Sequence, residues 1–316
     1  MLNIYKKITE DALISCIKKN YNQIATLWIE HQMTWINTTY SSFKDHDKYL
    51  IIISIVAKTL KFYHENAIKF SYDEYYSKNQ LQIENFNIID LSRELNLPKE
   101  TVRRKVKELE NLGVIKRIKK KMIIDRNSFS YVQPTNQIQV TSKFISKITE
   151  LLHKNKLIEK KLDSSFVEKN IKKNFTHIWL RFYSMQIPMA VKWQSYFGDM
   201  ATFHIWGNCI LNQAFNLKKT NGDSEREKDI FNADLVSSDH TTGINAMSLS
   251  ELSGIPRATV IRKLEKLIKM KHLKINEKKQ YLLTGEKLDE MIQIQNDVWN
   301  DKAKFLANTI NSIIIH

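Results

Sequence analysis

Glycine and proline are scarce in this chain, which has only 7 glycines and 4 prolines among its 316 residues. β-Sandwiches and barrels need many turns rich in these residues, so the scarcity argues against them and for a mainly helical protein. Cysteine is scarcer still. Cys16 and Cys209 lie far apart, with neither a metal-binding spacing nor a disulfide framework. This usage is typical of a reducing cytoplasm.

Long apolar segments are also missing. The most apolar run, from Tyr49 to Leu60, is interrupted by Lys58 and is too short to span a bilayer. No apolar run follows the first lysines, so we expect no secretion signal. Hydrophobic residues still make up 42% of the chain, which is enough for a packed core. We therefore expect a soluble, cytoplasmic protein with no membrane partner.

Signatures of catalysis are absent as well. The sequence has no P-loop, glycine-rich dinucleotide turn, nucleophile elbow or zinc signature. His204 and Cys209 are five residues apart, which does not bring two metal ligands to one helical face, so we interpret the histidines as buried or capping. The acidic residues of 222–234 fit a solvated loop better than a cation site. We expect no enzyme activity, cofactor or metal.

What the sequence does have is concentrated positive charge. The net charge is +15, and two windows supply 14 of these charges. Residues 97–126 hold 11 basic and 4 acidic residues, and residues 255–284 hold 9 and 2, so each window has a net charge of +7. Cations gathered in this way favour a polyanionic partner, and a phosphate backbone is the commonest one.

The first basic window lies within a motif at 89–126, which predicts two short helices, a tight turn and a strand-forming wing. The second helix, at 98–112, places four apolar residues at helical spacing: Val102, Val106, Leu109 and Leu112. Pro98 suits a first helical turn, and Asn96 tolerates a left-handed backbone in the turn before it. Gly113 suits the position after a helix. The pattern predicts a helix-turn-helix with a basic wing.

The same motif occurs again at 247–284, without a gap and 158 residues later. Pro98 falls on Pro256, Thr101-Val102 on Thr259-Val260, Arg104-Lys105 on Arg262-Lys263, and the apolar stripe on Val260, Leu264, Leu267 and Met270. Asn96 falls on Gly254, the other residue that readily adopts positive φ. A shared backbone requirement explains this exchange.

The repeat extends into the flanking segments at an offset of 154. Ser41, Phe43 and Asp45 fall on Ser195, Phe197 and Asp199, Trp28 on Phe182, and Tyr49 on Phe203. The change of offset from 154 to 158 predicts a longer connection in the second copy, within the polar, loop-like segment 216–243. We therefore predict a mainly α fold in which two winged helix-turn-helix units share a helical platform as a pseudo-dimer.

The predicted boundaries follow from this repeat. The first copy covers 1–158, with a helical part at 1–70, the winged helix at 86–127 and a connecting helix at 140–158. The second copy covers 159–316, with a helical part at 174–217, the winged helix at 244–284 and a closing helix at 286–312. Within the first copy we expect helices at 1–44 and 47–68, the latter capped by Asp45 or Asp47, and a loop at 70–86. The aromatic residues of 1–44 are interpreted as core or dimer-seam residues, with a ligand pocket as the alternative. The terminal isoleucines, 313–315, are expected to be buried or to form an association site.

Each motif resembles the winged helix-turn-helix of bacterial transcription regulators, and the order of elements is similar to regulators of the multiple-antibiotic-resistance (MarR) type. Such proteins work as homodimers that present one recognition helix to each half-site of an operator. The resemblance implies that this chain is a covalent pseudo-dimer that regulates transcription. Its two recognition helices are expected to enter the major groove of double-stranded DNA about one helical turn, ~34 Å, apart.

The candidate DNA-binding residues are the polar and basic side chains of the two motifs. In the first copy they are Lys99, Thr101, Arg103, Arg104, Lys105, Lys107, Arg117, Lys119, Lys120 and Lys121. In the second copy they are Arg257, Thr259, Arg262, Lys263, Lys266, Lys274, Lys278 and Lys279. The helices are expected to read bases and the wings to bind backbone. Because Ile261 stands in the place of Arg103 and Ala258 in that of Glu100, we predict an asymmetric target.

Other functions stay open at this stage. A plasmid- or phage-type replication initiator also carries two winged helices in one chain of similar length. A DNA-binding protein with little sequence preference, or an enzyme with a winged-helix accessory domain, is a further alternative. A small-molecule effector and self-association also stay open.

Overall fold

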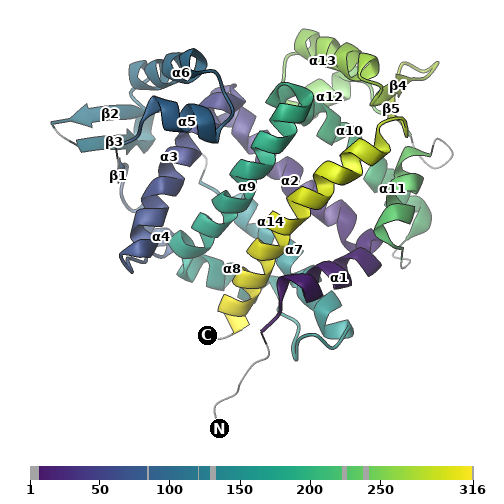
Figure 1. The fold of residues 1–316 in the computed structure, drawn as a ribbon, viewed down its shortest axis with the longest axis horizontal. Helices are drawn as coiled ribbons and strands as arrows, with labels where there is room; N and C mark the ends of the chain where they lie inside the picture. Colours follow the sequence, from purple (N-terminus) through teal and green to yellow (C-terminus); the bar gives the residue numbers. More distant parts are fainter. Residues whose placement is uncertain are drawn as a thin grey trace.

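A computed structural model describes residues 7–83, 85–119, 121–128, 133–222, 226–237 and 242–314. The chain is 72% helical, with a few small antiparallel strands, which confirms the mainly α prediction (Figure 1). Within the described ranges, no helix combines the length and the hydropathy needed to cross a bilayer. Cys16 and Cys209 are both buried and unpaired with each other.

The elements of the first half run from α1 to α7. They are α1 (Glu10–Lys19), α2 (Tyr21–Phe43), α3 (His46–Glu65), α4 (Tyr72–Tyr76), β1 (Gln80–Ile83), α5 (Ile88–Glu94), α6 (Lys99–Asn111), β2 (Ile115–Ile118), β3 (Lys121–Asp125) and α7 (Thr135–Lys154). Those of the second half are α8 (Ser164–Lys173), α9 (Phe175–Phe197), α10 (Met200–Asn221), α11 (Lys228–Val236), α12 (Ala246–Ser253), α13 (Arg257–Lys269), β4 (Leu273–Ile275), β5 (Tyr281–Leu283) and α14 (Leu288–Ile314).

The element boundaries recur at two fixed spacings. Helices α8 and α9 begin and end 154 residues after α1 and α2, and α10 begins 154 residues after α3. Helices α12 and α13 begin 158 residues after α5 and α6, and α13 also ends at that spacing. These are the two offsets at which the sequence motifs align.

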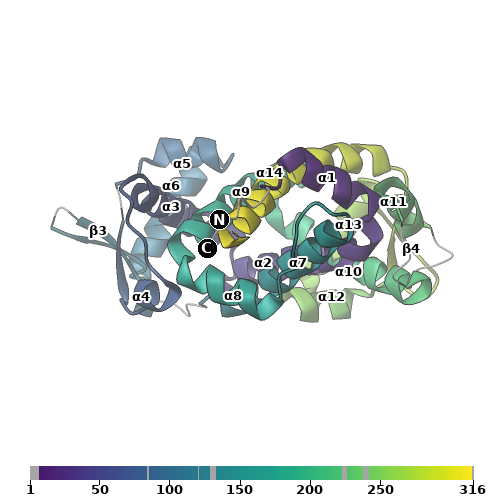
Figure 2. The ribbon, with the colours of Figure 1, turned by 90° about the horizontal axis from the view of Figure 1, so that it is seen from below.

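A central group of long helices forms the interior of the molecule. Helix α2 packs against α7 and α10, and α9 packs against α3 and α14, so the two halves of the chain interlock. The buried apolar residues form one continuous cluster to which both halves contribute. Seen from below (Figure 2), α14, α7 and α8 lie in the middle of the molecule, between the β2–β3 hairpin at one end and β4 at the other.

Helix ends follow from local side chains. Asp45 caps α3 by accepting hydrogen bonds from the backbone N–H groups of Asp47 (3.0 Å) and Lys48 (3.2 Å). This confirms Asp45 as one of the two predicted caps. Asp199 caps α10 in the same way and accepts from the Thr202 N–H at 2.8 Å. Each cap lies at the point where one long helix turns into the next.

Two predicted loops contain regular structure. Residues 70–86 include α4 and β1, and β1 is the edge strand of an antiparallel sheet ordered β1-β3-β2. Residues 216–243 include the end of α10 and all of α11, where Phe231 and Leu235 are buried four residues apart. Both predictions were wrong because polar side chains on the exposed faces outnumber the few apolar residues that make the contacts.

Other boundaries differ from the predictions in position. The predicted helix 1–44 is interrupted at Asn20, which separates α1 from α2 and donates to the Cys16 carbonyl at 2.8 Å. Helix α7 begins at Thr135 and ends at Lys154 rather than spanning 140–158. Helix α14 ends at Ile314, with Ile313 buried, and Ile315 lies outside the described residues.

Candidate nucleic-acid interface

Helices α6 and α13 each have 13 residues and follow a proline, Pro98 or Pro256, at the N-cap position. Each buries three apolar residues at helical spacing: Val102, Val106 and Leu109 in α6, and Val260, Leu264 and Leu267 in α13. The fourth predicted position differs. Leu112 is 53% exposed because it lies at the C-cap of α6, where the chain turns away. The remaining faces of both helices are free to carry polar and charged groups.

The turns before α6 and α13 have the backbone that the sequence predicts. Asn96 has φ +48° and Gly254 has φ +67°, so both adopt the left-handed conformation. Ser92 Oγ donates to the Leu97 carbonyl at 2.6 Å, and its counterpart Ser250 donates to the Ile255 carbonyl at 2.7 Å. The same hydrogen bond therefore closes both turns.

The two turn regions are also tied to the central helices. Asn96 Nδ2 donates to Ser195 Oγ on α9 at 2.8 Å, which links the first motif to the second half of the chain. In Figure 1, α6 and α13 both lie along the upper edge of the molecule, on either side of α9, and the two hairpins extend toward its outer ends. One edge therefore carries both helices.

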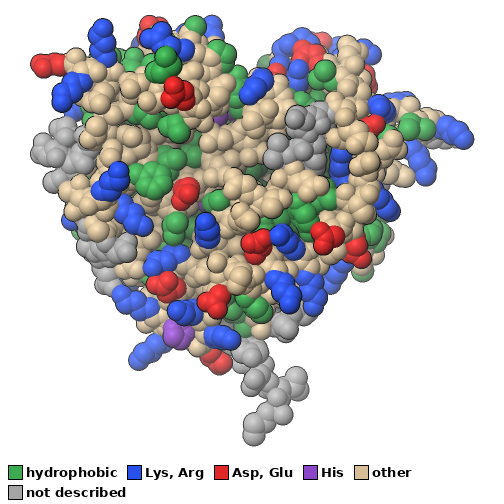
Figure 3. All heavy atoms as spheres, turned by 180° about the vertical axis from the view of Figure 1, so that it is seen from behind, with side chains coloured by type: hydrophobic (Ala, Val, Ile, Leu, Met, Phe, Trp, Pro, Cys, Tyr) green, Lys and Arg blue, Asp and Glu red, His purple; other side chains and the backbone are tan. Residues whose placement is uncertain are grey.

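Most of the predicted cations on this edge are exposed. In the first half the exposed cations are Lys99, Arg103, Arg104, Lys107, Arg117, Lys119 and Lys121. In the second half they are Arg257, Arg262, Lys274, Lys278 and Lys279. Thr101 and Thr259 are half-buried, and Lys120 lies outside the described residues. From behind (Figure 3), Lys and Arg side chains are seen on two lobes separated by a hollow, and on the projecting hairpin.

Three predicted DNA-binding lysines are directed inward instead. Lys105 forms an ion pair with Asp45, and Lys263 and Lys266 form ion pairs with Asp199 at 2.9 and 3.0 Å. Lys266 also donates to the Phe197 carbonyl at 2.6 Å. The helix-capping carboxylates attract these ammonium groups toward the central helices, so the three lysines fix α6 and α13 in place and do not lie on the exposed face.

The local charges also set the protonation of the anchor. Burial alone would raise the pKa of Asp199, but hydrogen bonds from Lys263, Thr202 and Lys266 outweigh it and lower this pKa to about 2. The carboxylate therefore stays charged over the whole neutral and mildly acidic range. Both ion pairs persist under those conditions.

The exposed faces of the two helices differ in how far their cations are neutralised. On α6, Arg103 pairs with Glu100 at 2.8 Å, Arg104 with Glu108 at 3.0 Å, and Lys107 with Glu110 at 3.5 Å. On α13, neither Arg257 nor Arg262 has an ion-pair partner within the described part of the chain. Helix α13 consequently presents the more strongly positive surface.

The hairpins after the helices share a tight turn formed by lysine. Lys119 has φ +57° and Lys279 has φ +56°, which places both lysines at the hairpin tips with their side chains exposed. The first hairpin has a third strand, β1, whereas the second has only a single bridge between Ile244 and Tyr281. The two basic tips therefore extend from hairpins that are supported differently.

Sequence reasoning missed the anchoring role of Asp45 and Asp199, which it interpreted only as helix caps. A signal was present, because the two aspartates are 154 residues apart and the lysines that they bind, Lys105 and Lys263, are 158 apart. Matching charges that recur at both offsets indicate a contact that occurs twice. Lys269, which is exposed on the last turn of α13, was also missed.

Metal binding and catalysis gain no candidate from the geometry. Across the described ranges, no three His, Cys, Asp or Glu side chains come together in a way that could hold a metal ion. His204 is buried, as expected, and contacts Asn37 Oδ1 at 2.7 Å and His46 at 3.0 Å. A scan of protein-family models finds no match for this chain, and searches of curated proteins and of solved structures find no match either.

Proposed function

We propose that this chain is a sequence-specific, double-stranded DNA-binding transcriptional regulator that reads DNA with two non-identical helices, α6 and α13. In this proposal, α5–α6–β2–β3 and α12–α13–β4–β5 are two winged helix-turn-helix units, duplicated within one chain and held as a pseudo-dimer by the central helices. One observation carries it: two helices of equal length, each after a left-handed turn and before a basic hairpin, lie on one edge of the molecule.

The equivalent anchors support a fixed spacing between the two reading helices. Lys105 joins α6 to the cap of α3, and Lys263 joins α13 to the cap of α10. Because α3 and α10 belong to the interlocked central helices, neither reading helix moves independently of that core. A rigid pair of helices selects two sites at a set separation along the duplex.

The contacts divide by position. Lys99, Arg103 and Arg104 on α6, and Arg257 and Arg262 on α13, are exposed and are assigned to base edges and nearby phosphates. The hairpin cations are assigned to the DNA backbone, and they supply affinity without sequence preference. Lys105, Lys263 and Lys266 are assigned to positioning rather than to DNA contact, because their ammonium groups are already paired.

The target is expected to have two unlike half-sites. The cations of α6 are partly neutralised by Glu100 and Glu108, whereas those of α13 are not. Arginines free of a carboxylate form bidentate contacts to guanine at lower cost. Helix α13 is therefore the more selective reader of the two.

Selection of bound sequences from a random duplex pool tests the proposal, followed by footprinting of the selected site. We expect two different half-sites with centres about 10 base pairs apart. A variant with Arg262→Ala should alter only one half-site. Lys169→Gln, on the exposed face of α8 away from this edge, is the matched control and should leave binding unchanged. Recovery of no preferred sequence, or of a perfect palindrome, contradicts the proposal.

A further inference from the structure

A second feature of the central helices lies apart from the proposed DNA-binding edge. A cavity of about 70 Å³ is enclosed by residues of α2, α9, α10, α11 and α14. Its walls are mostly aromatic and aliphatic, and they include Trp28, Trp193, Phe203, Phe231 and Trp299. This volume is several times what one water molecule needs but too small for a drug-sized ligand.

A lysine without a counter-ion faces this cavity. Lys302 on α14 is only 4% exposed, and its Nζ lies 3.6 Å from the ring centroid of Trp28 and 4.1 Å from that of Trp299. Among the described residues, no carboxylate or other hydrogen-bond acceptor pairs with it. The two indole rings attract a cation, but they do not replace the hydrogen bonds that an ammonium group loses on burial.

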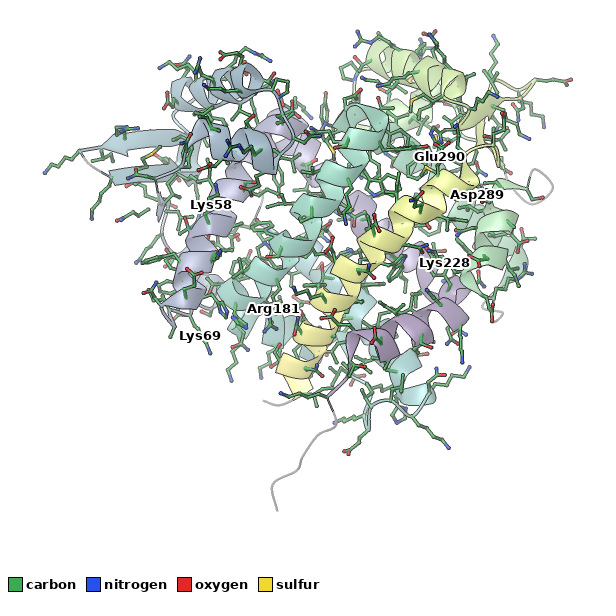
Figure 4. All side chains as sticks on the ribbon, in the orientation of Figure 1. Lys58, Lys69, Arg181, Lys228, Asp289 and Glu290 are labelled. Carbon is green, nitrogen blue, oxygen red and sulfur yellow. The ribbon has the colours of Figure 1, made fainter. Side chains whose placement is uncertain are left out.

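Other polar atoms of the cavity wall are also left without partners. Asn232 is 2% exposed, and its Nδ2 donates to no acceptor. Gln32 Oε1 and Gln295 Oε1 are likewise buried and unpaired. Nearby, Lys228 reaches from α11 toward α14 (Figure 4) and donates to Asn296 Oδ1 at 2.6 Å. The site therefore has spare donors, a positive charge and apolar walls, which together suit a small anion with an apolar body.

The corresponding cavity in the first half lacks this arrangement. It is lined by Trp35, Tyr49, Phe182 and Gln137, which are the counterparts of Met189, Phe203, Trp28 and Gln295 at the two offsets. Its cation, Arg126, donates to the carbonyls of Tyr75 and Lys78, both at 2.7 Å. The counterpart of Lys302 is Phe144, which stacks on His31 with ring centroids 5.4 Å apart. Only the second cavity holds an unpaired cation within the described ranges.

We propose that the second cavity binds a short-chain organic carboxylate, with the carboxylate on Lys302 Nζ and the alkyl chain against the rings of Trp28 and Trp299. Asn232 Nδ2 donates to the second carboxylate oxygen. The cavity volume limits the ligand to on the order of two to five carbons. Because the duplicate cavity has no equivalent of Lys302, each chain binds one ligand. This site is independent of the proposed DNA binding.

Protonation of Lys302 accompanies the binding. Burial, and then the positive charge of Lys228, hold the pKa of Lys302 well below its ordinary value. A bound carboxylate stabilises the ammonium form, so binding takes up a proton. The other titratable groups around the site are Tyr21, with a pKa of about 12, His31, about 3, and Lys228, about 8. Between pH 5.5 and 7 these three groups keep their charge states, which isolates Lys302.

Calorimetric titration of the full chain with butyrate tests the proposal. The uncharged isostere butyramide, inorganic phosphate and octanoate serve as comparisons for charge, apolar body and size. We expect one butyrate per chain, with at least tenfold weaker binding of each comparison ligand. Lys302→Met should weaken butyrate at least tenfold and leave the affinity for butyramide unchanged. Lys304→Met removes the same charge from an exposed position of α14 and should change neither affinity.

A measurement on the unmodified chain keeps the test valid if Lys302→Met does not fold. Titrations in two buffers of different ionisation enthalpy should give the uptake of up to one proton per butyrate. The proposal is overturned if butyrate does not bind, if butyramide or phosphate binds as tightly, or if butyrate binding takes up no proton. Unchanged butyrate affinity in Lys302→Met also overturns it.

Discussion

Gln32 Nε2 donates a 2.9 Å hydrogen bond to Oε1 of Gln186, and these two glutamines are 154 residues apart. This is the spacing that separates α2 from α9 at both ends. A residue that contacts its own counterpart lies on or near a two-fold axis, as in an isologous dimer interface. The contact therefore supports the pseudo-dimer part of the proposed function, and it places the axis where α2 and α9 approach each other.

The glutamine pair should behave as a unit when it is mutated. Gln32→Leu leaves the amide of Gln186 buried without its partner, which should cost about 1–3 kcal/mol in the free energy of unfolding. The double variant Gln32→Leu/Gln186→Leu removes both buried amides, so it should be more stable than the sum of the two single losses predicts. Denaturant unfolding of the four proteins measures this coupling. Strictly additive losses would argue against direct contact between the two side chains.

The anchor of α13 predicts a pH-dependent contribution to stability. The pKa of Asp199 is about 2 in the folded chain and 3.8 when unperturbed, so its contribution is fully present above pH 3.8 and is lost as the pH falls toward 2. Because the side chain is one-third exposed, we expect about 1 kcal/mol after solvent screening. Asp199→Asn retains the helix cap but removes the charge. The stability difference between this variant and the native chain should be present at pH 5 and vanish near pH 2.

Lys169→Gln provides the control for that comparison, since Lys169 is exposed on α8. Its unfolding free energy should follow that of the native chain at each pH. If the difference between Asp199→Asn and the native chain stays constant from pH 5 to pH 2, the ion pairs of Asp199 do not stabilise the fold.

The reading helices were predictable from sequence because their determinants are local. Apolar spacing gave the buried faces of α6 and α13, and the Asn96–Gly254 exchange gave the left-handed turns. The strand β1 was not predictable in this way, because Leu81 and Ile83 are ordered by pairing with β3, which lies about 40 residues further along the chain. A four-residue strand carries too little periodicity to be recognised alone.

The inward lysines show a second limit. Lys105 and Lys107 are both lysines on the flank of an amphipathic helix, yet only Lys105 meets the carboxylate of Asp45. Sequence spacing on one helix cannot separate them, because the difference depends on how α6 lies against α3. The same holds for Lys302, whose burial depends on Trp28 from the opposite end of the chain. Contacts between distant segments decide which charges are available for binding.

The first hairpin should control affinity without controlling sequence preference. Lys119 and Lys121 are exposed and have no ion-pair partner among the residues that the structure describes. If each contacts one phosphate, Lys119→Gln/Lys121→Gln should reduce the slope of log K against log salt by about 1.8. Affinity should fall by a similar factor for preferred and random duplexes. A loss confined to the preferred sequence would mean that this hairpin reads bases.

The two reading helices should respond unequally to loss of an arginine. Arg262 on α13 is exposed without a carboxylate partner in the described chain, whereas its neighbour in role on α6, Arg103, is held by Glu100 at 2.8 Å. Arg262→Ala should therefore cost about 1–3 kcal/mol of binding free energy and relax the preference at one half-site. Arg103→Ala should cost less, because DNA must first displace Glu100. Binding of both variants to the selected duplex and to base-substituted versions of each half-site measures the difference. Equal losses would mean that the Glu100 pair does not weaken the contact of Arg103 with DNA.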